Sequence, residues 1–311
     1  MVIYYRKSLR RAQYEHVCHL SRLSDCGIKG KGYAALATAL KSNPSHLEEL
    51  DLRGNDPRHA ELKLLIDLLQ DPACKLKSLR VLSSDTADEA LVYLTSVLGG
   101  NPLLLTELDL RGKKTGDSGV KQFCALLEDS QYRVEKLRLG NCSITGEGCA
   151  ALISALTSNP SHLKELHLND NVIGDSGLKQ ISTLLRNPDC KLQRLGLSDC
   201  GVTGEGYAAL ASALKSNPSY LEELDLRGND PGDSGVELLM SAVTNQKCKL
   251  RLLSDEAERA CEYLTSVLGR NPLLLTELDL RGKKPGDSGV KQFCPLLKDS
   301  HCRIKNLMLV I

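Results

Sequence analysis

A 29-residue period is the feature that most constrains what this chain can fold into. The ten letters LEELDLRGND begin at Leu47 and return at Leu221, and the pattern L-x-x-L-x-L recurs between and around them. Its copies start at Leu47, Leu76, Leu105, Val134, Leu163, Leu192, Leu221, Leu250, Leu275 and Ile304, with a degenerate copy at Cys18. Every step is 29 residues except that from Leu250 to Leu275, which is 25. Such a period predicts one supersecondary unit per copy, each needing its neighbours to bury a core.

Each unit predicts a strand, a turn and a helix. The L-x-x-L-x-L run alternates apolar and polar residues, which is typical of a short strand with one buried face. A glycine-rich turn such as TGEG or GDSG follows, and then an amphipathic helix in which Leu210, Ala213 and Leu214 share a face. We expect the aspartate of GDSG to cap the N-terminus of its helix, and an Asn-Pro pair to end it. The GDSG aspartates are Asp117, Asp175, Asp233 and Asp287.

Stacked units of this kind predict an α/β leucine-rich-repeat solenoid. The horseshoe has parallel strands on its concave face and helices on its convex face. A solenoid core grows along one axis, so the 311 residues need not divide into globular domains. We therefore expect a single solenoid over residues 1–311, with 1–17 as an N-terminal capping segment. Residues 18–311 then hold about eleven repeats, one of them shortened to 25 residues.

The ninth position of each repeat alternates in kind. An Asn or Cys at this position can turn inward and satisfy the backbone groups left bare where the strand ends. A lysine cannot be buried there without a partner, so the turns at Lys113 and Lys283 are expected to flare outward. The ninth-position residues are Cys26, Asn55, Ser84, Lys113, Cys142, Asn171, Cys200, Asn229 and Lys283.

One repeat carries a deletion. The segment Ser24–Pro57 returns at Ser198–Pro231, an offset of 174, which is six periods of 29. The segment Tyr93–Leu137 returns at Tyr263–Leu307 with an offset of only 170. The missing four residues fall where CKLRLLSD replaces CKLKSLRVLSSD, so we expect a shortened or irregular strand around Leu250–Leu253.

The alternation of Asn-type and Cys-type units resembles the ribonuclease-inhibitor class of leucine-rich repeats. The stretches Ser198–Val236 and Leu103–Phe123 are also similar to the repeat region of NACHT–leucine-rich-repeat (NOD-like) innate immune receptors, particularly the fish-type set. This resemblance covers nearly the whole chain and implies a protein-interaction or ligand-sensing role. The chain has no G-x-x-x-x-G-K-[ST] motif, so nucleotide-driven oligomerisation cannot be carried over to it.

Composition excludes several classes of function. The 40 basic and 39 acidic residues give a net charge of +1, so no bulk field favours nucleic acid or membrane. Aromatic residues make up only 4% of the chain, which leaves few stacking platforms for RNA. No apolar run approaches the roughly 18 residues of a membrane span, and the N-terminus lacks the apolar core of a signal peptide. We expect a cytoplasmic protein.

Reactive residues follow the repeat rather than a catalytic pattern. The twelve cysteines form no CxxC and recur at fixed structural phases, which favours buried thiols over disulfides. His46 and His162 occupy the same loop position of two repeats. No nucleophile elbow, zincin or kinase motif is present. The sequence therefore predicts no enzyme, no cofactor and no metal site.

The concave face is the expected binding surface, because it displays the variable positions of L-x-x-L-x-L-x. The third-position candidates are Glu49, Glu107, Lys136, Glu165, Arg194 and Glu223. The fifth-position candidates are Asp51, Asp109, Arg138, His167, Asp225 and Asp279. The seventh-position candidates are Arg53, Arg111, Arg227 and Arg281, which lie at strand ends and look freest to bind.

Two interpretations of this charged face remain open. Strands about 4.8 Å apart should let Glu107, Lys136, Glu165 and Arg194 pair laterally. The ladder then either neutralises itself, with exposed pairs contributing roughly 0–1 kcal/mol each, or forms a mosaic surface for a partner protein.

Three functional hypotheses follow. The first is a module of an innate immune receptor that binds a protein or a microbe-derived ligand. The second is a ribonuclease-inhibitor-like protein that wraps a basic enzyme, which the mixed charge of the face disfavours. The third, an RNA-binding solenoid, lacks aromatic platforms. Since the chain stops at Ile311 directly after a strand, we expect either a longer receptor or an end that meets another chain, and the sequence leaves the oligomeric state open.

Overall fold

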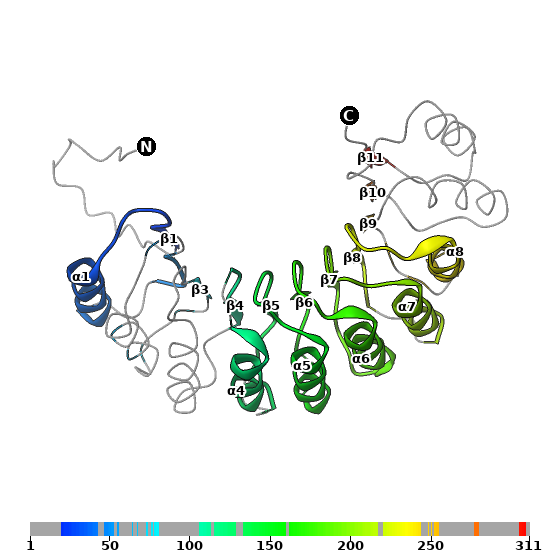
Figure 1. Cartoon of the computed structure of the whole chain (residues 1–311). Coiled ribbons are helices and arrows are strands. Elements are labelled where there is room, and N and C mark those ends of the chain that lie inside the picture. The colour runs from blue at the N-terminus through cyan, green and yellow to red at the C-terminus, as the bar shows by residue number, and fades with distance from the viewer. Residues whose placement is uncertain are drawn as a thin grey trace.

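The computed structural model describes eleven strands and six helices along one curved array (Figure 1). The described residues are 20–42, 47–52, 55, 64, 67, 73, 76, 78–80, 106–112, 115–128, 133–159, 162–216, 220–243, 248, 250, 252–254, 277–279 and 305–308. In Figure 1 the strands line the inner side of an arc and the helices its outer side. The predicted α/β leucine-rich-repeat solenoid is confirmed.

The strands form one parallel sheet in which each strand pairs only with its sequence neighbours. Every strand begins at the third position of a predicted repeat, so the phasing read from the leucines is confirmed along the sheet. The strands are β1 (Leu20–Arg22), β2 (Glu49–Asp51), β3 (Ser78–Arg80), β4 (Glu107–Asp109), β5 (Lys136–Arg138), β6 (Glu165–His167), β7 (Arg194–Gly196), β8 (Glu223–Asp225), β9 (Leu252–Ser254), β10 (Glu277–Asp279) and β11 (Asn306–Met308).

The described helices start at the predicted glycine-rich turns. They are α1 (Gly30–Ser42), α4 (Gly116–Glu128), α5 (Gly146–Ser158), α6 (Gly174–Arg186), α7 (Gly204–Ser216) and α8 (Gly232–Val243). Helix α5 ends at Ser158 with Asn159 as its C-cap, as the Asn-Pro pair predicts. No described helix is long and apolar enough to cross a lipid bilayer. The limits of a single solenoid over 1–311 stay a prediction, and the capping segment 1–17 lies outside the described residues.

The core lies between the sheet and the helices and is aliphatic. The central leucine of a strand, such as Leu166, is fully buried, as are Leu210 and Ala213 from the predicted apolar face of α7. Every described element contacts only its immediate neighbours, so the core is continuous along the array without any long-range closure. That is the packing expected of a solenoid.

The ninth-position asparagines turn inward, as predicted. Asn171 accepts hydrogen bonds at Oδ1 from the backbone N–H groups of Cys142 and Ile144, each at 3.0 Å. Its Nδ2 donates to the carbonyls of Leu139 and Leu168 at 2.8 and 2.7 Å. Asn55 and Asn229 repeat this arrangement. Each asparagine therefore joins its own strand end to that of the preceding repeat. Lys113 and Lys283, the predicted outward flares, lie outside the described residues.

Two of the GDSG aspartates, Asp117 and Asp175, bond to the next helix instead of capping their own, which corrects the prediction for these two. Asp287 lies outside the described residues. The N-cap of α6 is Ile173 and makes no side-chain cap hydrogen bond. Instead Asp175 accepts hydrogen bonds from Thr203 and Gly206 at the start of the next helix, α7, at 2.6–3.0 Å. Asp117 receives the same bonds from Thr145, 28 residues on. The reason is the side-by-side stacking of the helices, which brings each aspartate over the bare N–H groups of its neighbour.

The shortened repeat keeps a regular strand, so the prediction of a shortened one is wrong. Strand β9 has three residues, as the other strands do, and its Leu253 pairs with Leu224 on one side and Leu278 on the other. The step from Leu224 to Leu253 is 29 residues and that from Leu253 to Leu278 is 25. Leu253 thus occupies the regular central position of a strand. Without this strand, backbone groups of β8 and β10 would lose their hydrogen-bond partners. The deletion falls between β9 and β10.

Candidate functional site

Strands β4 to β8 present a charged row along the concave face. The third-position residues are in direct register across neighbouring strands, with Glu107 opposite Lys136, Lys136 opposite Glu165, Glu165 opposite Arg194, and Arg194 opposite Glu223. Charges of opposite sign therefore alternate from strand to strand. Parallel pairing in a fixed register keeps these side chains adjacent.

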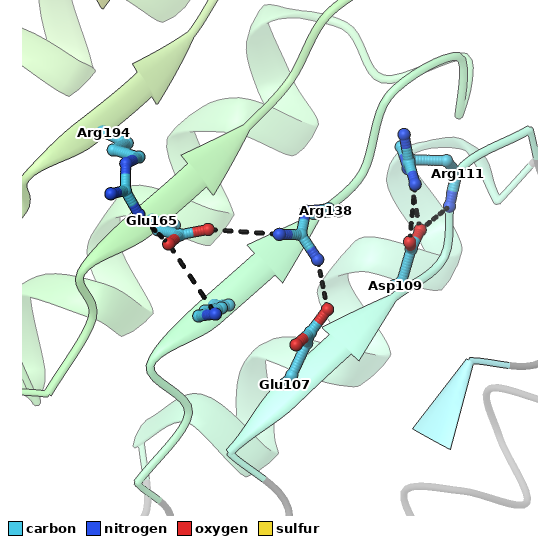
Figure 2. A network of polar contacts seen from close by, with 7 residues as sticks. Glu107, Asp109, Arg111, Arg138, Glu165 and Arg194 are labelled. Atoms are coloured by element: carbon cyan, nitrogen blue, oxygen red, sulfur yellow. Dashed lines mark hydrogen bonds and ion pairs between the residues drawn. The ribbon is translucent and has the colours of Figure 1, made fainter. Parts of the chain in front are cut away.

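Glu165 is the centre of this row, which we call the charge ladder (Figure 2). Its carboxylate is paired with Lys136 at 3.8 Å, with Arg138 at 3.1 Å and with Arg194. Arg194 also pairs with Glu223 at 3.0 Å. The predicted lateral pairing is confirmed for Lys136, Glu165 and Arg194, and it extends one strand further. Glu107, the fourth residue of that prediction, is paired with Arg138.

Arg138 adds a link that position counting did not predict. It occupies the fifth position of its repeat, at the end of β5. Its Nη1 pairs with Glu107 on β4 and its Nη2 with Glu165 on β6. Figure 2 shows this guanidinium between the two carboxylates. The long arginine side chain reaches diagonally, so the ladder is continuous from β4 to β8.

The two signs of charge differ in depth. The side chains of Glu107 and Glu165 are only 9% and 6% exposed, whereas Lys136 and Arg194 are 38% and 44% exposed. The glutamate side chains lie close to the sheet surface, and the longer lysine and arginine side chains extend over them. Cations therefore cover Glu107 and Glu165, whereas Glu223 at the β8 end of the ladder is itself 32% exposed.

Two of the seventh-position arginines are paired within their own repeats. The Nε and Nη2 atoms of Arg111 donate to the carboxylate of Asp109 at 2.9 and 2.8 Å, and Arg227 makes the same bidentate pair with Asp225. Burial by itself would raise the pKa of Asp109, but the hydrogen bonds and charge of Arg111 outweigh it and lower that pKa. Both arginines are thus held by an aspartate two residues back, and the expectation that they are the freest to bind stays a prediction.

The remaining predicted residues are placed in part. Glu49 on β2 is exposed, whereas Asp51 is 5% exposed. Asp279 is a residue of β10. Arg53 and Arg281 lie outside the described part of the chain. The role of every predicted candidate in binding stays a prediction.

A pocket of about 470 Å³ opens where β4, β5 and β6 end. Its lining includes two arginines and a histidine, namely Arg111, Arg138 and His167. Burial lowers the pKa of His167, and the nearby charge of Arg138 lowers it further, which favours the neutral ring. Gly196 on the next strand leaves room for this ring, since a Cβ there would lie 2.6 Å from its Nδ1.

The polar wall of this pocket is completed by Asn141, Asn169 and Asp170, and none of the three is among the predicted binding residues. Asn141 and Asp170 occupy the eighth position of their repeats with φ angles of 54° and 59°, in the left-handed region. That position is also left-handed at Asp25, Gly112, Asp199 and Gly228. The signal that could have found it is compositional, because Asn, Asp and Gly are the residues that tolerate this backbone.

The cysteines of the described repeats are free thiols. Six of them are buried and Cys26 is exposed. The prediction of buried thiols is confirmed for those six and is wrong for Cys26, which lies at a ninth position but near the start of the array. Burial raises the pKa of both Cys149 and Cys200 to about 12, which suppresses thiolate chemistry there. Among the described residues, no group of His, Cys, Asp and Glu is arranged to hold a metal ion.

Comparison with known proteins agrees with this geometry. A sequence profile described as a leucine-rich repeat matches residues 43–56, 134–152, 159–182, 189–211 and 217–240. Ribonuclease inhibitor from Sus scrofa is 34% identical over 96% of this chain and 52% of its own length. NACHT, LRR and PYD domains-containing protein 12 from Mus musculus is 37% identical over 93% of this chain and 22% of its own length. The chain is a leucine-rich-repeat region of the ribonuclease-inhibitor type.

This leucine-rich-repeat region spans about half the length of the ribonuclease inhibitor and about a fifth of the NACHT protein. The relatives thus share the repeat region with it. The fish-type origin stays a prediction. Among solved structures, leiomodin-1 actin-binding site 2 matches 48% of this chain and 86% of its own, at 22% identity and a TM-score of 0.40.

Proposed function

We propose that this leucine-rich-repeat region is a non-enzymatic protein-interaction and ligand-sensing module that binds through its concave face. The observation that carries the proposal is the continuous charge ladder from β4 to β8. Its side chains are fixed by ion pairs to neighbouring strands, so the surface is organised before a partner arrives. Preorganisation reduces the entropy lost on binding.

The relatives support the receptor version of this proposal. Repeat regions of NACHT, LRR and PYD domains-containing proteins align with 93% and 99% of the chain, which suits the repeat region of a NOD-like innate immune receptor. The partner is then a protein on the concave face or a microbe-derived molecule, met in the cytoplasm. No nucleic acid, membrane, cofactor or metal enters the proposal.

Two double variants with unchanged net charge test which face binds. Lys136→Gln with Glu223→Gln removes one cation and one anion from the concave face and leaves Glu165 paired with Arg138 and Arg194. The matched control, Lys179→Gln with Glu205→Gln, removes an exposed convex pair whose charged atoms lie 2.8 Å apart.

Quantitative affinity enrichment from cell extract should retain the same proteins on the wild-type chain and on the convex control. Those proteins should fall to background on the concave variant, and the strongest of them should then bind the purified wild-type chain directly. Equal loss on both variants, or no loss on either, would contradict binding through the concave face.

The second candidate function is inhibition of a ribonuclease by wrapping, which the 34% identity to a ribonuclease inhibitor favours. A basic enzyme would need acidic groups at the surface, whereas here Glu107 and Glu165 lie beneath cations. We therefore expect no inhibition of a secreted basic ribonuclease by nanomolar protein. Stoichiometric inhibition in that assay would favour the second candidate over the first.

A further inference from the structure

The pocket at the ends of β4, β5 and β6 combines three features that bear on the chemistry of the partner. Arg111 and Arg138 line it with side chains that are 48% and 20% exposed. The carboxylates that hold these arginines, Asp109 and Glu107, are only 2% and 9% exposed. A molecule entering the pocket therefore meets guanidinium groups before it meets the acids beneath them.

The remaining wall offers hydrogen-bonding groups without partners. Within the described residues, no hydrogen bond reaches the carboxamide of Asn141, the ring of His167 or the carboxylate of Asp170. Asn141 and His167 can each donate to an oxyanion. Asp170 is the one opposing charge, and it stands on an exposed turn at the rim.

Cationic groups also continue beyond the pocket. Arg194, 44% exposed, lies on β7, three strands from β4, and Arg111 lies in the turn that follows β4. At about 4.8 Å per strand the separation across the sheet alone is about 14 Å, which is longer than a single small anion can span. A chain with several carboxylates fits such a spread of cations better than one free ion does.

We propose that this pocket receives a carboxylate from an acidic segment of the partner protein, with the segment continuing over the outer cations of the charge ladder. The inference rests on the proposed protein-interaction function and names the chemistry of its partner. Arg111 and Arg138 supply the charge, Asn141 and His167 supply donors, and Asp170 opposes binding.

Two isosteric substitutions with opposite expected effects test this site. Asn141→Asp places a negative charge in the wall, and Asp170→Asn removes one from the rim. Both positions have left-handed backbone, which Asn and Asp both tolerate, so neither change should introduce backbone strain. The control is Asp25→Asn, at the same repeat position with φ 53° but on the turn after β1, five strands from β6.

The probe is a dye-labelled hexaglutamate peptide titrated with the full chain at about 0.1 M salt, with hexalysine and hexaglutamine peptides alongside. We expect hexaglutamate to bind tightest, Asn141→Asp to weaken it about tenfold, and Asp170→Asn to strengthen it about tenfold. Asp25→Asn should change the affinity by less than about twofold, since a Debye length of about 10 Å screens a distant charge.

Several outcomes would overturn the inference. If hexalysine or hexaglutamine bound as tightly as hexaglutamate, the pocket would have no preference for an acidic segment. If Asp25→Asn strengthened binding as much as Asp170→Asn, the effect would come from the net charge of the chain and not from the pocket. Displacement of the peptide by an equal concentration of inorganic phosphate would assign the pocket to free phosphate instead. The concave double variant leaves the pocket walls intact, so a failure of the proposed function and a failure of this inference give different results.

Discussion

At the scale of single residues, buried asparagines carry the joints between repeats. Asn171 is 1% exposed and makes four hydrogen bonds of 3.0 Å or less to backbone groups on two successive turns. A single carboxamide can do this because it has two donors and an acceptor oxygen that takes two bonds. The residue chosen at the ninth position is therefore dictated by backbone groups that no water reaches.

Replacing Asn171 should be costly. Asn171→Ala is expected to lower the free energy of unfolding by about 2–4 kcal/mol, since buried N–H and C=O groups would lose their partners. Urea denaturation followed by circular dichroism measures the change. Asn169→Ala is the control, because the Asn169 side chain accepts only a long bond of 3.4 Å from Ser198, and it should cost less than about 1 kcal/mol. Comparable losses of unfolding free energy in the two variants would show that the ninth position contributes no more to stability than the seventh.

At the scale of elements, capping between repeats couples neighbouring helices. Asp175 on α6 accepts from the backbone and hydroxyl of Thr203 at the start of α7. The third member of the contact is Gly206, which donates its N–H and whose missing side chain makes room, since a Cβ there would lie 2.6 Å from Asp175 Oδ1. The N-terminus of α7 is thus capped by a side chain of the preceding repeat.

A double-mutant cycle should expose this coupling. Asp175→Ala and Thr203→Val each remove the side-chain bond, so their destabilisations should overlap by about 1 kcal/mol rather than add. Additive losses in thermal or urea unfolding would mean that the contact contributes nothing. Thr183→Ala, at an exposed position further along the same helix, serves as the comparison.

Acid should weaken the same contact. Burial alone would raise the pKa of Asp175, but hydrogen bonds from Thr203 and Gly206 outweigh it and lower that pKa below the ordinary value of 3.8. The stabilisation is therefore complete above the unfolded-state pKa and is lost as pH falls through the lower folded-state pKa. Between about pH 5 and pH 3 the melting temperature of the wild type should fall more steeply than that of Asp175→Asn.

The strand of the shortened repeat yields a second prediction at this scale. Because β9 pairs on both sides in regular register, its amides should exchange as slowly as those of β8. Hydrogen–deuterium exchange of the native chain compares Leu252–Ser254 with Glu223–Asp225 directly. Markedly faster exchange in β9 would show that the deletion weakens the sheet itself.

At the scale of the whole molecule, nearest-neighbour packing decides how stability is distributed. Each described element touches only the elements beside it, so a repeat at either end has fewer supports than one in the middle. Buried cysteines are spread along the described array and report on this gradient. Cys26 is exposed in the folded chain, while Cys149 and Cys200 are fully buried near the centre.

Thiol labelling at increasing urea concentration should follow that gradient. Cys26 should react at once, and Cys149 and Cys200 should react last, because their burial excludes the reagent and keeps the thiol protonated. Mass spectrometry of digested protein locates each modified cysteine. Simultaneous labelling of all buried thiols would show one cooperative unit instead of a progression from the ends.

The sequence by itself determined the repeat, the phase of every strand, the inward asparagines and the lateral pairing at Glu165. These follow from periodic leucines and from backbone groups that must be satisfied, and both are local consequences of residue type and spacing. Only the tertiary structure decided three other features: Asp175 caps the next helix, Arg111 folds back on Asp109, and carboxylates lie beneath cations. Each depends on distances and depths set when repeats stack side by side, and a one-dimensional period carries no information about depth.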